Sequence, residues 1–444
     1  MRVYSGDFGR AEAERLLWRA GFGPRPGDIE SLAGKGLRSA VLSLTRPAGS
    51  ERLEGAAPSV DGEPLAPTDA WGHDHLWWLD RMVRSNQPLV ERMTLNWHDW
   101  FATSRSGVDK AQLMLDQNKL LRRNALGNFG TLLTRITTDP AMLLWLSGSE
   151  NNKWEPNENY AREMMELFTL GAGRGYTEQD VREQARALTG WRNDWDDGIG
   201  PHRFRYDTKF HDSGAKRIFG KRGHFTWRDS VRLCLNHRSH PSFVVQKLWS
   251  YFIPTTPDAK TARALAAMYV RGKHQIRPLV EAILMHPDFY NGPRMVKPPV
   301  VYVAGLLRAT GKGIDRDDWT WICDLAGQML FRPPNVAGWD ETRWLDTATF
   351  RGRWMAANTA LEGLAIDPDK NPVASLSPAA DAVDAAIQFW GNPSISETTR
   401  KALEKFAADA GAMADKKWKI GSYGVLRQNA LRILVATSPD LQTC

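Results

Sequence analysis

The stretch TEQDVREQARAL, residues 177–188, indicates the fold class of the whole chain. Thr177 and Asp180 occupy the first and fourth positions of a capping box, in which each side chain hydrogen-bonds the backbone N–H of the other residue. The apolar residues that follow, Val181, Ala185 and Leu188, recur at the spacing of one helix face. The stretch therefore predicts an amphipathic helix that begins directly after Thr177.

The same helix-starting devices recur along the chain. Asp139 and Ser377, each followed by proline, and Ser396 all precede apolar segments of helical period. Sustained alternation of apolar and polar residues is rare, and Gly and aromatic residues replace the helical pattern near residues 203–225. We therefore predict an all-α fold, a large multi-helix array with at most a short β-hairpin in that interval.

Composition is typical of a globular protein without a membrane span. Of the 444 residues, 42% are hydrophobic and 25% are charged. The longest apolar runs, at residues 142–146 and 433–436, are far shorter than the roughly 20 residues that cross a bilayer. No signal-peptide pattern opens the sequence, and the 3 cysteines are odd in number and widely spaced. We therefore expect a cytoplasmic location.

Two irregular stretches interrupt the helical pattern. Residues 50–67 are rich in Gly, Pro and Ala, which is typical of an exposed loop. Residues 366–377 are rich in Pro, Asp and Ser and precede the last helices. We therefore expect a main helical body at residues 1–365 and a C-terminal helical extension at residues 366–444 that packs on it.

The excess of positive charge does not by itself indicate nucleic acid. The net charge of +7 arises from 58 basic against 51 acidic residues, spread along the chain. The densest basic patch, residues 216–228, includes Phe219, Phe225 and Trp227 and has the groups that contact phosphates and bases. Because no nucleic-acid motif accompanies it, we favour a solvated loop and expect no nucleic-acid partner. The 19 tryptophans offer large flat faces to ligands.

The first candidate for chemistry is the acidic segment between Pro156 and Gly171. Pro156 permits a helix to begin and Gly171 can end it. Carboxylates and a guanidinium within two turns are able to hold a divalent metal, or to divide into a protonated acid and an ionised base. The alternative is an exposed helix with a salt bridge between residues four apart. The polar residues concerned are Asn157, Glu158, Asn159, Arg162, Glu163 and Glu166.

Three further segments are candidates. His211, Asp212 and Lys216 share a loop with Gly214, which could supply a general base or an anion clamp, or form a turn that caps its own backbone. His98 lies among large aromatic residues, where a buried, hydrogen-bonded histidine is the default. Trp339 ends a rigid Pro-Pro loop and either stacks on a ligand or plugs the core.

Taken in order, these segments resemble the bacterial domain of unknown function 1800 family, from Arg15 to Pro439. Residues 97–104 are similar to its Trp-His-Asn-His-Phe-Ala-Thr pattern, and residues 157–191 match its hallmark. The His211–Lys216 and Pro333–Trp339 segments follow in the family's order.

The resemblance implies a bacterial protein whose four segments contribute to one site. The family has no assigned reaction, and its members often accompany secreted phosphatase-like or sulfatase-like proteins. The family's second histidine is replaced here by Trp100, which weakens a metal role for His98.

Our leading hypothesis is a hydrolase or lyase that acts on a hydroxyl-rich or anionic substrate such as a glycan. A glutamate of raised pKa would act as the acid, and a second carboxylate would act as the base or hold a divalent metal. The predicted catalytic residues are Glu158, Glu163, Glu166, His211 and Asp212. The predicted substrate-binding residues are Asn157, Asn159, Arg162, Lys216, His98 and Trp339.

The alternative is a non-catalytic binding or assembly module. In that case the same polar groups form a buried structural network, and the tryptophans hold a ligand or partner.

Overall fold

The computed structural model describes residues 1–367, 370, 375–414 and 417–444, and 54% of the chain is helical. Up to residue 187 the helices are α1 (Arg10–Arg19), α2 (Asp28–Ala33), α3 (Gly36–Thr45), α4 (His73–Arg84), α5 (Pro88–Trp100), α6 (Ala111–Arg123), α7 (Phe129–Thr137), α8 (Pro140–Trp145), α9 (Asn159–Glu163), the π-helix η1 (Met164–Thr169) and α10 (Glu178–Ala187).

Beyond residue 187 the helices are α11 (Trp227–Leu235), α12 (His240–Ser250), α13 (Ala259–Arg271), α14 (Ile276–Leu284), α15 (Pro287–Asn291), α16 (Pro299–Thr310), α17 (Asp318–Leu325), the 3-10 turn η2 (Glu341–Arg343), α18 (Thr347–Leu361), α19 (Ala379–Phe389), α20 (Glu397–Ala412), α21 (Lys417–Thr437) and α22 (Pro439–Gln442).

Helix starts follow the capping devices in the sequence. The side chain of Thr177 accepts from the Asp180 N–H, and the Asp180 carboxylate accepts from Thr177 in return, at 2.9 Å. Asp139 and Ser396 cap α8 and α20 without the return bond, through side-chain oxygens that accept from the Met142 and Thr399 N–H groups, whereas Ser377 does not cap α19. Side-chain oxygens thus satisfy backbone donors that the first helical turn leaves free.

Strands are few in the described residues and form three two-stranded antiparallel sheets. They are β1 (Ser59–Val60) with β2 (Glu63–Pro64), β3 (Trp191–Asp196) with β4 (Gly200–Tyr206), and β5 (Lys216–Ile218) with β6 (Lys221–Gly223). The predicted all-α class is confirmed. The β3–β4 hairpin begins upstream of the predicted interval, and its register shifts between Arg192 and Asp194, which interrupts the alternation that reveals a strand.

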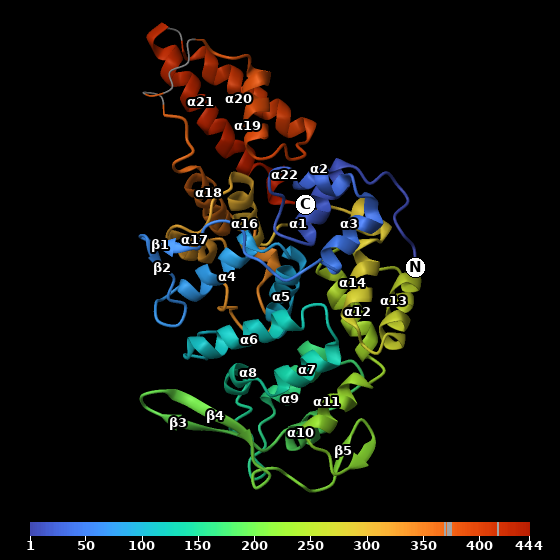
Figure 1. Cartoon of the computed structure of the whole chain (residues 1–444). Helices are drawn as coiled ribbons and strands as arrows, with labels where there is room; N and C mark the ends of the chain where they lie inside the picture. The colour runs from blue at the N-terminus through green and yellow to red at the C-terminus, as the bar shows by residue number, and fades with distance from the viewer. Residues whose placement is uncertain (368–369, 371–374, 415–416) are drawn as a thin grey trace.

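Two large hydrophobic clusters fill most of the interior, beside a small third one, and α5 contributes to both of the large ones. Trp97 and Trp100 belong to the first cluster, with residues of α7, η1, α12 and α14. Leu95 belongs to the second, with residues of α4, α16 and α18. Figure 1 shows α5 near the middle of an elongated molecule, with the β3–β4 hairpin at one end and α19–α21 at the other.

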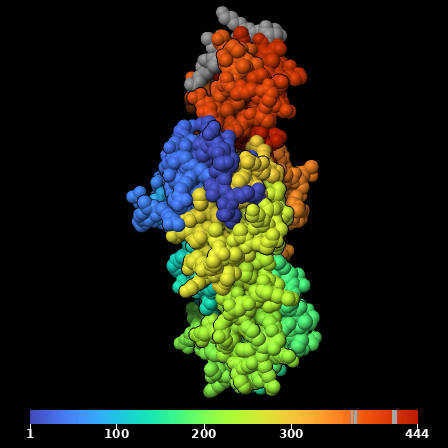
Figure 2. All heavy atoms as spheres, turned by 90° about the vertical axis from the view of Figure 1, so that its right-hand side faces the viewer, coloured from blue at the N-terminus to red at the C-terminus, as the bar shows by residue number. Residues whose placement is uncertain are grey.

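The C-terminal helices lie on the rest of the molecule through the second cluster. Ala386 and Leu431 share that cluster with Trp78 and Val303. Figure 2 shows residues from this part as a mass at one end. The division at residue 365 into body and extension stays a prediction, and residues 368–369 and 371–374 of the predicted linker lie outside the described residues.

In the described part of the chain, none of the helices combines the length and apolar character needed to span a bilayer.

Candidate functional site

The acidic segment forms α9 and η1, and its charged groups gather around Arg162. The Arg162 guanidinium lies 3.0 Å from Glu158, 3.3 Å from Glu166 and 2.7 Å from Glu178 of α10. Arg182 lies 3.7 Å from Glu158. We call these five residues the surface ion-pair network. It contains the salt bridge between residues four apart that is expected of an exposed helix. All three of its carboxylates, Glu158, Glu166 and Glu178, therefore already have a cationic partner.

The remaining polar residues of this segment differ from one another. The side-chain oxygen of Asn157 accepts from the Asn159 N–H at 2.9 Å, and the backbone N–H of Asn157 donates to the Asn151 side chain at 2.9 Å. Asn157 therefore shapes the start of α9. The side chain of Glu163 forms no hydrogen bond or ion pair with the described residues. Burial and the neighbouring Glu166 charge raise the pKa of Glu163.

The His211–Lys216 turn is hydrogen-bonded internally. Nδ1 of His211 lies 3.0 Å from the Thr189 carbonyl oxygen, and burial lowers the His211 pKa. The Gly214 N–H donates to the Asp212 carboxylate at 2.8 Å, which is the self-capping turn weighed above. The Lys216 ammonium donates to the carbonyl oxygens of Asp212 and Gly214.

Asp212 is also paired with a cation. Arg186 lies 2.7 Å from Asp212 and 2.9 Å from Glu183. Burial raises the pKa of Asp212, but the hydrogen bonds from Arg186 and Gly214 outweigh burial and lower it. Glu158 and Asp212 therefore pair with different arginines of α10, Arg182 and Arg186. Within the described residues no hydrogen bond or ion pair links the acidic segment to the His211–Lys216 turn, and no three His, Cys, Asp or Glu side chains are arranged to hold a metal ion.

His98 and Trp339 do meet. Their ring centroids are 5.6 Å apart, and Trp78 and Phe331 lie 5.3 and 5.6 Å from the His98 ring. Nε2 of His98 is buried without a hydrogen-bond partner, and burial lowers the His98 pKa to about 3. His98 is therefore a neutral ring inside an aromatic cage.

The residue after His98 connects this cage to a second group of polar side chains. The Asp99 carboxylate accepts from the Trp339 main-chain N–H at 2.9 Å. Gly338 makes the approach possible, because it has a φ of +94° and a Cβ there would lie 2.2 Å from an Asp99 carboxylate oxygen. Two segments almost 240 residues apart in the sequence thus meet at Asp99.

Lys247 approaches from α12. Its ammonium donates to the Leu167 carbonyl oxygen in η1 at 3.3 Å and lies 4.7 Å from the Trp100 ring centroid. Carbonyl groups in the last turn of a helix lack intrahelical donors, and Lys247 supplies one. Burial lowers the Lys247 pKa to about 8, and the Asp99 charge opposes that shift. The two groups form no direct ion pair.

Arg92, Asn96 and Asp99 follow one another along the same face of α5. The Arg92 side chain is 2% exposed, and its Nε and Nη1 have no hydrogen-bond partner; nor does Nδ2 of Asn96. Its guanidinium lies 5.0 Å from the Tyr251 ring centroid, and the Tyr251 hydroxyl donates to the Arg92 carbonyl oxygen at 3.1 Å.

Arg92 is exceptional among the buried arginines that the structure describes. Each of the others donates to at least three oxygen atoms, whereas the Arg92 guanidinium donates to none. A buried cation without hydrogen bonds is costly to fold. The others are Arg19, Arg308, Arg353 and Arg427.

Glu341 of η2 completes the group at the surface. Its side chain is exposed, yet surrounding protein raises its pKa, and the Arg92 charge opposes that shift. Burial raises the Asp99 pKa to about 6, against the Trp339 hydrogen bond and the Lys247 charge. We call this group the central polar cluster: Arg92, Asn96, Asp99, Lys247, Tyr251 and Glu341.

The family model described as "Protein of unknown function (DUF1800)" matches residues 15–443, nearly the whole chain. The chain belongs to the DUF1800 family. Neither a curated protein nor a solved structure matches it.

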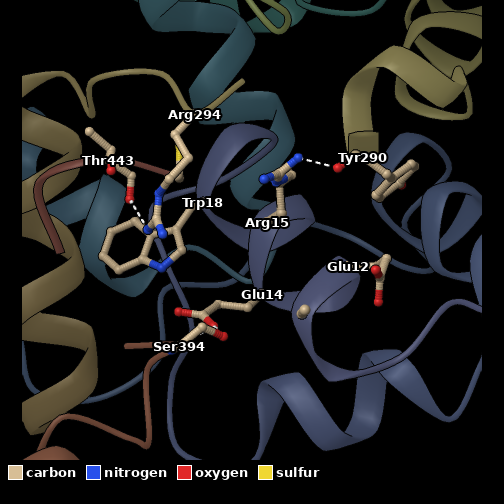
Figure 3. Close-up of a pocket in the computed structure, with 10 residues that line it drawn as sticks. Glu12, Glu14, Arg15, Trp18, Tyr290, Arg294, Ser394 and Thr443 are labelled. Carbon is tan, nitrogen blue, oxygen red and sulfur yellow. Dashed lines mark hydrogen bonds between the residues drawn. The ribbon is translucent and has the colours of Figure 1, made fainter. Parts of the chain in front are cut away.

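This DUF1800 chain also has a cavity of about 230 Å³ beside α1 and α15. Figure 3 shows Arg15, Arg294, Trp18 and Tyr290 around it. Arg15 donates to the Tyr290 carbonyl oxygen, and Arg294 donates to that of Thr443 at 3.1 Å. The cavity includes none of the predicted site residues, and its cations are already bonded, in contrast to Arg92.

Three of the four predicted segments of this DUF1800 chain reach the central polar cluster. Residues 97–101 supply Asp99, the acidic segment supplies the Leu167 carbonyl oxygen, and Pro333–Trp339 supplies the Trp339 N–H. Sequence reasoning missed Arg92, Asn96, Asp99, Lys247, Tyr251 and Glu341. A signal for three of them was present, because Arg92, Asn96 and Asp99 recur as a polar stripe on one face of α5.

Proposed function

We propose that the central polar cluster is the active site of a hydrolase- or lyase-type enzyme that acts on a hydroxyl-rich or anionic substrate such as a glycan. The observation that carries the proposal is the buried Arg92 guanidinium without hydrogen bonds, on the same face of α5 as Asp99, whose carboxylate does not pair directly with the Lys247 ammonium. Unsatisfied buried polar groups cost stability, and they concentrate where a ligand supplies the missing partner.

Asp99 and Lys247 suit acid–base chemistry near neutral pH. With pKa values of about 6 and about 8, Asp99 is mainly ionised and Lys247 mainly protonated between those limits. Asp99 would accept the proton of a substrate hydroxyl or water, and Lys247 would donate a proton to the departing oxygen. The proposal therefore predicts a bell-shaped dependence of kcat/KM on pH with limbs near 6 and 8.

The earlier assignment of catalysis to the acidic segment and the His211–Lys216 turn remains a prediction. The pairing of Glu158, Glu166 and Asp212 with arginines favours a structural role for those three carboxylates. Glu163 is the unpaired member of the predicted set and is the one to test separately.

Turnover of chromogenic esters, phosphate esters and glycosides tests the proposal. Asp99→Asn and Lys247→Met should each lower kcat/KM by about 10²–10⁴-fold without lowering the melting temperature. Glu178→Gln, an exposed member of the surface ion-pair network, is the matched control and should leave turnover unchanged. Full turnover in Asp99→Asn would refute the proposal, and loss of turnover in Glu163→Gln alone would favour the earlier assignment.

A non-catalytic binding or assembly module is the second candidate. The observation in its favour is that Trp154 and Trp195 are 69% and 67% exposed, which leaves aromatic surface accessible to a ligand or partner. This candidate treats the central polar cluster as a structural network. Asp99→Asn would then lower the melting temperature, the opposite of the result expected for an active site.

A further inference from the structure

We propose that Arg92 and Asn96 bind an oxyanion, a carboxylate or phosphate group on a ligand that also carries a hydroxyl group. This inference rests on the proposed function, because it names the substrate class of the same site. It assigns Arg92 and Asn96 to binding and leaves acid–base chemistry to Asp99 and Lys247.

The unpartnered atoms of the cluster are all donors. Nε and Nη1 of Arg92 and Nδ2 of Asn96 are buried without partners. Arg92 and Asn96 are four residues apart on α5, so their side chains are neighbours on one face of the helix. A ligand that accepts hydrogen bonds from these atoms removes the penalty that the ligand-free protein bears.

The geometry of the donors favours an oxyanion over a neutral acceptor. Two adjacent N–H groups of a guanidinium match the paired oxygens of a carboxylate or phosphate. The Lys247 ammonium already donates to the Leu167 carbonyl oxygen, so the unpartnered donors are those of Arg92 and Asn96. The positive charge of Arg92 has no direct counter-ion among the residues that the structure describes.

The carboxylates of the cluster define the rest of the ligand. Asp99 and Glu341 would repel a bare anion at their own positions, but both accept hydrogen bonds from hydroxyl groups. A hydroxyl group next to the anionic group therefore suits the side of the cluster that Asp99 and Glu341 occupy. Asp99, Lys247 and Tyr251 are half-buried and Glu341 is exposed, so the cluster extends from the interior to solvent.

Thermal shift and calorimetric titration with inorganic phosphate, glycolate, acetate and chloride test the inference. Phosphate or glycolate should raise the melting temperature saturably, glycolate should bind more tightly than acetate, and chloride should have no saturable effect. Arg92→Met should weaken oxyanion binding by about 10- to 100-fold, as expected for the loss of a charge-assisted hydrogen bond. Arg351→Gln, at an exposed arginine of α18, is the matched control and should bind as the wild type does.

Asn96→Asp is an independent second variant. It places a carboxylate one helical turn from Arg92, where an internal pair would occupy the guanidinium and abolish phosphate binding while raising the melting temperature. Saturable binding that survives both Arg92→Met and Asn96→Asp would overturn the inference, as would the absence of any saturable effect of phosphate or glycolate on the wild type.

The two proposals fail separately. Asp99→Asn removes a negative charge and should bind phosphate at least as tightly as the wild type, even though its turnover is lost. Lost turnover in Asp99→Asn with no oxyanion binding to the wild type overturns only this inference. Oxyanion binding through Arg92 with full turnover in Asp99→Asn overturns only the proposed function.

Discussion

Two consecutive residues of α5, Glu91 and Arg92, are both buried and both charged, but their surroundings are opposite. The Glu91 carboxylate is fully buried and accepts from Trp78, Arg81 and Arg122, at 3.1, 3.0 and 2.5 Å. The Arg92 guanidinium, on the next position around the helix, has no such partners.

The comparison separates a charge that stabilises the fold, that of Glu91, from a buried charge without stabilising hydrogen bonds, that of Arg92. The Arg122 and Arg81 charges outweigh the desolvation of Glu91 and lower its pKa, so the folded state favours the ionised form. Asp99, on the face of Arg92, has a raised pKa because burial dominates. We infer that the first face is structural and that the second is kept for a ligand.

Glu91→Gln should give the largest loss of stability. It leaves the partly buried Arg122 without a counter-ion and Arg81 with Glu51 alone, so the free energy of unfolding should fall by about 3–5 kcal/mol. Urea denaturation at pH 7 measures the change, and an unaltered midpoint would contradict the assignment of Glu91 to the structural face.

Asp99→Asn should change stability in the opposite direction and in a pH-dependent way. The pKa of Asp99 rises from 3.8 to about 6 on folding, so its stabilising contribution is present below pH 3.8 and lost as the pH rises through 6. Asparagine keeps the acceptor for Trp339 without the charge. The variant should therefore gain up to about 3 kcal/mol above pH 6 and nothing near pH 4. A gain that is the same at both pH values would show that Asp99 ionisation is not its cause.

Lys247→Met should give a smaller gain. The pKa of Lys247 falls from 10.5 to about 8 on folding, so its stabilising contribution is present above pH 10.5 and lost as the pH falls through 8. Methionine removes the buried charge but also the Leu167 hydrogen bond and the Trp100 contact, which leaves a net gain of about 1–2 kcal/mol at pH 7. Melting curves at pH 7 and 10.5 check this, since the gain should disappear at the higher pH.

Glu158→Gln and Glu166→Gln should have the smallest effects. Both carboxylates are partly exposed and share Arg162, so each substitution should cost less than about 1 kcal/mol. High salt should reduce the cost further because it screens exposed charges. A loss of several kcal/mol in the free energy of unfolding that salt does not change would show that these carboxylates support the fold as Glu91 does.

Local structure was predictable from the sequence to the extent that it depends on neighbouring residues. The cap at Thr177, the self-capping turn at Asp212 and the Glu158–Arg162 bridge are set within four residues, and all three form. The central polar cluster depends instead on contacts between α5, α12 and η2, which lie some 90 to 250 residues apart. No local pattern specifies that Trp339 donates to Asp99, although the polar stripe on α5 marks one side of the site.

The most direct test of the account is the free energy of unfolding of Arg92→Met, measured by urea denaturation beside the wild type at pH 7 without added oxyanion. If Arg92 is an unpaired charge kept for a ligand, methionine should stabilise the protein by about 1–4 kcal/mol. If the variant is instead destabilised by several kcal/mol, Arg92 supports the fold as Glu91 does, and the central polar cluster is not a binding site.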